Sequence, residues 1–134
     1  MRVVLDVKVL VSGLLSRGGA PGRLITLWLE GAFELIVSEM LLAELARTLA
    51  HPKLKERISD HDGVEFVELL RSAASVVPDE PNPPSVCADP GDDYLIALAS
   101  GSSSVLITGD LHLLALAPGR PIHAPADLVA MLVR

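Results

Sequence analysis

Short, mostly apolar runs constrain the fold of this chain most strongly. Val3 to Leu5 form a continuous apolar run, and Phe33 to Val37 and Ser104 to Ile107 are predicted as two further short strands. A strand with two apolar faces belongs in a sheet that is covered on both sides, as parallel sheets are. The sequence therefore predicts a central, mainly parallel sheet.

Helical patterns occupy the segments between these runs. We predict helices over residues 23–30, 39–50, 63–74, 111–116 and 124–133, a further helix that begins at Pro90, a helix or loop over 7–15, and minor strands over 76–77 and 121–123. Strands that alternate with helices through short connections indicate a parallel sheet with helices on both faces.

Length, charge and cysteine content narrow the class of protein. The 134 residues predict a single domain over residues 1–134. A net charge of −6 argues against a non-specific nucleic-acid binder, but it is compatible with a metal-dependent nuclease whose acids bind cations. Cys87 is the only cysteine, so no disulfide framework is expected. We find no signal peptide or membrane span in the sequence and expect a soluble cytoplasmic protein.

Acidic residues occur at corresponding places along the chain. Asp6 follows the first strand and Asp110 follows the third. Ligands of open parallel sheets bind beyond the carboxyl ends of the strands, although each acid alone is also explained as a helix cap. Glu44 borders the apolar face of its helix, where it either is a solvated flank or leans towards the strand ends.

The segment from Asp89 to Asp93 is the most informative one. Asp89 suits the cap of the following helix, with Pro90 at its first position and Asp92 placed for a capping box. Asp92 also shares a helix face with Leu95, Ile96 and Ala99, and a carboxylate on such an apolar face needs a cation or donors. Asp93 lies about 100° round the helix and is expected to be peripheral.

Together, these positions predict four carboxylates near one edge of the sheet. Such a group repels strongly unless cations neutralise it or its pKa values rise. A cluster of oxygen ligands without cysteine or paired histidine suits Mg²⁺ or Mn²⁺. The chemistry that these ions most naturally serve is phosphodiester hydrolysis.

The same residues carry a family resemblance, in four segments that keep their order along the chain: Val3–Asp6, Ser38–Leu45, Cys87–Leu95 and Leu106–Leu114. They resemble the PIN domain, and in particular the VapC-like toxins of bacterial toxin–antitoxin modules. The resemblance implies a three-layer α/β/α sandwich, Mg²⁺- or Mn²⁺-dependent endoribonuclease activity on single-stranded or structured RNA, frequent homodimers and a cognate antitoxin. It implies Asp6, Glu44, Asp92 and Asp110 as catalytic metal ligands, with Thr108 as a supporting hydroxyl.

One position departs from the family pattern. The first motif typically reads Asp-Thr-Asn or Asp-Val-Asn, whereas this chain has Asp6-Val7-Lys8. The Lys8 ammonium could pair with Asp6 in place of a metal, or it could extend to solvent and contact substrate phosphate. We therefore expect Lys8 to be a supporting residue and the nuclease activity to be reduced. Asp93 is expected to be a further supporting residue. The alternative is a catalytically impaired PIN-fold module that acts through protein partners.

Two rival families that begin with a strand and an aspartate fit less well. A haloacid-dehalogenase-like phosphatase needs a second acid where Lys8 stands. A receiver domain needs an acidic pair at the first strand end and an acceptor aspartate after the third strand, and neither is evident. The nuclease and the binding module remain the two hypotheses.

Overall fold

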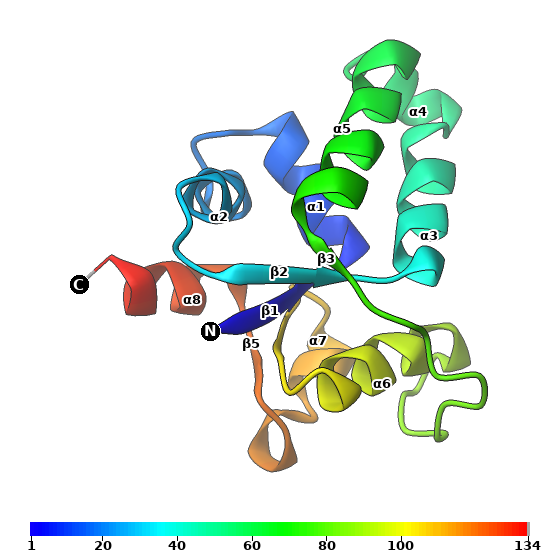
Figure 1. Ribbon diagram of the computed structural model, residues 1–134, viewed down its shortest axis with the longest axis vertical. Coiled ribbons are helices and arrows are strands. Elements are labelled where there is room, and N and C mark those ends of the chain that lie inside the picture. The colour runs from blue at the N-terminus through cyan, green and yellow to red at the C-terminus, as the bar shows by residue number, and fades with distance from the viewer. Residues whose placement is uncertain (134) are drawn as a thin grey trace.

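A computed structural model describes residues 1–133, in which strands and helices alternate as predicted (Figure 1). In chain order the elements are β1 (Arg2–Leu5), α1 (Val7–Leu15), α2 (Ala20–Leu29), β2 (Glu34–Val37), α3 (Glu39–Leu49), α4 (Pro52–Lys55), α5 (Asp60–Ala73), β3 (Ser75–Val76), the 3-10 helix η1 (Pro90–Asp92), α6 (Asp93–Gly101), β4 (Val105–Ile107), α7 (Leu111–Leu114), the 3-10 helix η2 (Ala117–Gly119), β5 (Ile122–His123) and α8 (Pro125–Leu132).

The strands form one sheet in the order β3-β2-β1-β4-β5, and every neighbouring pair is parallel. Figure 1 shows α1 to α5 on one side of the strands and α6 with α7 on the other, while α8 packs against α2. The predicted three-layer α/β/α architecture is therefore confirmed. None of the helices within residues 1–133 has the length and apolar composition needed to cross a membrane.

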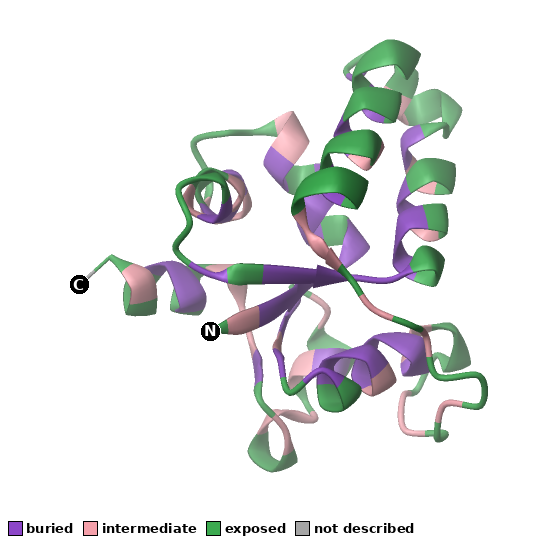
Figure 2. Ribbon diagram, viewed as in Figure 1, coloured by how far each residue is buried: buried purple, intermediate pink, exposed green. Residues whose placement is uncertain are grey.

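Both faces of the central strands are buried (Figure 2). Val3 and Val4, which point to opposite faces of β1, have no exposed surface. Ile36 of β2 and Ile107 of β4 are equally inaccessible. The continuous apolar runs thus fold as expected for a parallel sheet between two helical layers.

The glycine-rich break after α1 is shorter than the sequence suggests. We expected the helix to begin at residue 23, but α2 begins at Ala20, with Pro21 in its first turn. Gly22 lies against the backbone of the preceding loop, where an added Cβ would come within 2.5 Å of the Arg17 carbonyl oxygen. This glycine therefore permits a close approach of helix and loop, which its sequence context did not distinguish from a turn residue.

The segment before α6 also differs from the expected helix. Pro90 begins η1 rather than an α-helix, and Asp89 Oδ1 accepts a hydrogen bond of 2.8 Å from the Gly91 amide. α6 starts only at Asp93, and Asp92 makes no side-chain capping bond. The expected capping box is absent, so helix capping does not explain the position of Asp92.

The strand order places the carboxyl ends of β1 and β4 at the centre of the sheet. Chain connections proceed from β1 towards β2 on one side, whereas β4 and β5 lie on the other. Open parallel sheets bind their ligands beyond the strand ends at the point where the strand order reverses. Asp6 and Asp110 follow these two strands.

Candidate functional site

Thr108 connects the acids that follow the two central strands. Leu5 lies opposite Ile107 in the β1–β4 ladder, so Asp6 and Thr108 emerge side by side. The buried Thr108 hydroxyl donates to Asp6 Oδ2 at 2.8 Å and accepts from the Asp110 amide at 3.0 Å. The hydroxyl that family resemblance placed beside the last acid therefore bridges the first and the last acid.

The two strand-end acids also cap the helices that follow them. Asp6 Oδ1 accepts from the Lys8 amide at 3.5 Å, and Asp110 Oδ1 accepts from the His112 amide at 2.8 Å. Each capping bond uses one carboxylate oxygen and leaves the charge in place. The structural and the functional explanations of these acids are therefore compatible.

Asp92 lies in the electrostatic field of the other acids. Its half-buried side chain accepts no hydrogen bond within residues 1–133. Burial, followed by the charges of Asp6, Asp89, Asp110 and Glu44, raises the pKa of Asp92 to about 6. The structure therefore brings the four predicted acids together. It adds Asp89, which the sequence analysis treated as a cap alone.

Glu44 leans towards this group from α3. Its carboxylate Oε2 accepts a hydrogen bond from the hydroxyl of Tyr94, a buried residue of α6. Burial, together with Glu44, raises the pKa of Tyr94, so the phenol remains a donor. Of the two positions that the sequence left open for Glu44, the structure shows the inward one. No sequence pattern singled out Tyr94 as a site residue, although it is the only tyrosine and follows Asp92 by two residues.

Asp93 is buried, which corrects the expectation that it is peripheral. Its Oδ1 accepts from the amides of Cys87 at 2.7 Å and Val86 at 2.9 Å. These two bonds hold the pKa of Asp93 below its usual value. Helical periodicity could not reveal this role, because the donors belong to the irregular segment before η1. Asp93 therefore anchors that segment to the start of α6.

Of the two positions considered for Lys8, the structure shows the one in which the side chain extends to solvent. Its side chain is exposed, and no ion pair joins it to Asp6 in the described part of the chain. The ammonium therefore does not occupy the place of a cation within the acidic group. Its position two residues beyond Asp6 leaves it beside the carboxyl edge of the sheet.

The donor set fits a hard divalent cation that the protein must obtain from solution. All four predicted ligands offer carboxylate oxygens, and none of them forms an ion pair within residues 1–133. Their spacing is open, because in the same residues the one group of three ligand atoms within 4.8 Å of one another is His61, Asp62 and Glu65. That exposed trio on α5 contains an ordinary helical pair, His61 with Glu65 at 3.1 Å.

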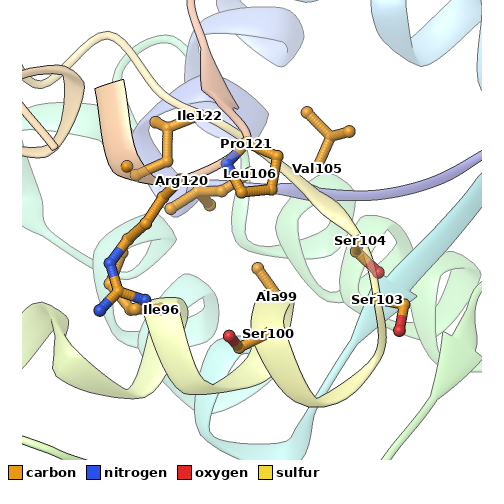
Figure 3. A pocket seen from close by; sticks show the side chains of 11 residues that line it. Ile96, Ala99, Ser100, Ser103, Ser104, Val105, Leu106, Arg120, Pro121 and Ile122 are labelled. Atoms are coloured by element: carbon orange, nitrogen blue, oxygen red, sulfur yellow. The ribbon is translucent and has the colours of Figure 1, made fainter. Parts of the chain in front are cut away.

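A separate cavity of about 390 Å³ lies away from the acids (Figure 3). Its walls come from α6 and from the segments around β4 and β5, including Ala99, Leu106 and Ile122. Arg120 is its one charged lining residue, and none of the four predicted acids contributes to it. This cavity is therefore not part of the acidic group.

Comparison with known proteins identifies the family and the fold. Residues 2–112 match the family described as PIN domain. The chain is 28% identical over 116 residues to the uncharacterized protein MJ1680 of Methanocaldococcus jannaschii. The aligned region covers 87% of this chain and 75% of that protein.

Two solved structures share the fold at low sequence identity. PAE2754 of Pyrobaculum aerophilum is similar with a TM-score of 0.68 and 16% identity, over 98% of this chain and 89% of that one. The structure of VapBC2 from Rickettsia felis bound to a DNA fragment from its promoter contains a similar chain, with a TM-score of 0.64 and 12% identity, over 92% and 98%.

Proposed function

Because the chain belongs to the PIN domain family, we propose that it is a metal-dependent endoribonuclease and the toxin of a toxin–antitoxin pair. The observation that carries this proposal is that Asp6, Asp110 and Glu44 lie near enough to Asp92 for their charges, after burial, to raise its pKa. Such like-charge crowding favours the binding of a cation. The neighbouring VapBC2 structure supports the assignment to a toxin–antitoxin system.

We assign Mg²⁺ or Mn²⁺ as the cofactor, held by Asp6, Glu44, Asp92 and Asp110. When bound, the ion would activate the attacking water and stabilise the negative charge on the phosphate during hydrolysis. The protein orients the ligands, since Thr108 holds Oδ2 of Asp6. Asp6 and Asp110 follow β1 and β4, Asp92 directly precedes α6, and Glu44 lies within α3. We propose that an RNA backbone approaches these acids from solvent.

The proposed substrate is single-stranded or structured RNA, and the proposed partner is a cognate antitoxin that blocks the acidic edge. We further propose a homodimer. Its support is that the packed helices α3 and α5 expose the apolar side chains Met40, Val64 and Leu69. Light scattering after size-exclusion chromatography tests the dimer, which Val64→Asp is expected to weaken.

RNA cleavage by the purified chain tests the proposed function. We expect phosphodiester hydrolysis in Mn²⁺ or Mg²⁺ and none in EDTA. Asp92→Asn should reduce the rate at least about 100-fold, since even outer-shell partners of a metal contribute about 10–100-fold. Asp127→Asn is the matched control, because Asp127 is an exposed acid on α8. Equal rates for wild type and Asp92→Asn, or cleavage that persists in EDTA, would refute the proposal.

Lys8 favours a second candidate function, a PIN-fold binding module with an impaired metal site. The nuclease hypothesis expects Lys8→Asn to increase Mn²⁺-dependent cleavage, because an exposed cation beside the acids opposes metal binding. Calorimetric titration with Mn²⁺ separates the two functions. Binding that Asp92→Asn abolishes supports the nuclease, whereas a wild-type chain that binds no Mn²⁺ supports the module.

A further inference from the structure

Tyr94 is a buried polar residue whose partner is one of the four acids. Its side chain is 5% exposed, and its hydroxyl donates to Oε2 of Glu44. The two residues belong to different helical layers, since Tyr94 is in α6 and Glu44 is in α3. This hydrogen bond therefore connects the two layers across the carboxyl edge of the sheet.

Packing alone explains the ring of Tyr94 but not its hydroxyl. The ring belongs to the hydrophobic core, where phenylalanine would fill the same space. A buried hydroxyl destabilises the fold unless it has a partner, and Glu44 is the partner that the described residues provide. The geometry thus couples the core to a half-buried carboxylate at the candidate site.

The bond also restricts Glu44. The charges of the cluster repel its carboxylate towards solvent, and a donor from the core opposes that movement. With Oε2 engaged, the remaining oxygen, Oε1, accepts no other side-chain donor within residues 1–133. Thr108 acts similarly on the other side of the cluster, where it engages Oδ2 of Asp6.

We propose that Tyr94 is a positioning residue, whose hydroxyl fixes Oε2 of Glu44 so that Oε1 is presented to a divalent cation. The proposal rests on the proposed function, because it requires that the four acids bind a metal. It assigns to Tyr94 the part that hydrogen-bonded outer-shell partners play at metal sites, where their loss weakens metal binding about 10–100-fold.

Tyr94→Phe tests the proposal, since it removes the hydroxyl and keeps the ring. Calorimetry should give a Kd for Mn²⁺ that is higher by about tenfold or more. The Mn²⁺ concentration for half-maximal RNA cleavage should increase by the same factor. The KM for RNA, and the rate at saturating Mn²⁺, should change little. A purely structural role would instead lower the rate at every Mn²⁺ concentration.

Ser102→Ala is the matched control. Ser102 follows α6 at its other end, is buried, and donates to the Leu98 carbonyl at 2.6 Å. Removal of this hydroxyl should leave Mn²⁺ affinity unchanged, although it perturbs the same helix. A loss of affinity as large as that of Tyr94→Phe would overturn the proposal, because the effect would then come from general damage to α6.

A double-mutant cycle tests whether Tyr94 acts through Glu44. In a Glu44→Gln background, Tyr94→Phe should weaken Mn²⁺ binding no further, because the residue acts through the Glu44 carboxylate. Independent effects of the two substitutions would contradict it. Failure of the positioning role is distinct from failure of the proposed function. If the wild-type chain cleaves RNA but has the same Mn²⁺ affinity as Tyr94→Phe, only the positioning role is refuted. A wild-type chain that binds no Mn²⁺ refutes both.

Discussion

Two adjacent carboxylates at the start of α6 lie in regions of opposite character. Asp92 lies in the acidic cluster, which it forms with Asp6, Glu44 and Asp110. There burial, and then the charges of the other acids, raise its pKa to about 6. Asp93 lies in the loop anchor, by which we mean its hydrogen bonds to the amides of Val86 and Cys87 that lower its pKa. The fold therefore disfavours the charged form of Asp92 and stabilises the charged form of Asp93, the next residue in the chain.

This difference in environment distinguishes a residue suited to binding a cation from a residue that stabilises the fold. A satisfied, buried carboxylate stabilises its loop because its charge meets oriented donors. A carboxylate among other carboxylates destabilises the metal-free chain, and it becomes favourable only when a cation binds. The carboxyl edge of this sheet thus has the electrostatics of a binding site, and the loop anchor has those of a structural joint.

The largest expected effect is stabilisation of the acidic cluster by metal. At 100 times its Kd, Mn²⁺ should raise the free energy of unfolding of the wild-type chain by about 2.7 kcal/mol, because only the folded chain assembles the site. Thermal unfolding with and without Mn²⁺ measures this change. Asp92→Asn should remove most of the stabilisation. A similar increase in Tm for this variant would show that Mn²⁺ binds elsewhere, for which the exposed trio on α5 is the first candidate.

Loss of the loop anchor comes next. Asp93→Ala should lower the free energy of unfolding by about 2 kcal/mol, because it leaves the Val86 and Cys87 amides without their acceptor. Urea denaturation in EDTA measures the change. Asp93→Asn is the milder control, since its amide oxygen can still accept from both donors. If the alanine variant unfolds at the wild-type urea concentration, the loop anchor contributes no stability.

Much of the fold was predictable because strand burial and helix periodicity are local signals. The apolar run Val3–Leu5 indicated a strand buried on both faces, and the alternation of elements indicated a parallel α/β/α fold. Helix starts were predicted less well. The beginning of α2 depends on the approach of Gly22 to the Arg17 backbone, which is a tertiary contact. The interruption of α6 at Asp92 accompanies the loop anchor of Asp93, another contact that sequence spacing does not reveal.

The candidate site divides in the same way. The sequence could place Asp6 and Asp110 at one edge, because the strand before each acid fixes its position. It could not place Glu44, whose direction depends on a hydrogen bond from Tyr94, 50 residues away. Nor could it separate the roles of Asp92 and Asp93, because the helix face that each presents depends on where α6 begins.

The smallest expected effect concerns the acidic cluster without metal. Asp92→Asn should raise the free energy of unfolding in EDTA at pH 7 to 8 by about 1 kcal/mol, because an uncharged amide removes the cost of burying a charge and the repulsion from Asp6 and Asp110. Asp127→Asn, at an exposed site on α8, should change it by less than about 0.5 kcal/mol.

Urea denaturation of these variants and of Asp93→Ala in one buffer distinguishes the two regions by the sign of the change in the free energy of unfolding. A stabilised Asp92→Asn beside a destabilised Asp93→Ala is expected if the fold tolerates repulsion at the carboxyl edge in return for cation binding. Destabilisation by both substitutions would mean that Asp92 is also a structural residue. The distinction between the acidic cluster and the loop anchor would then fail, because the burial and repulsion of its charge would not be the dominant influence on Asp92.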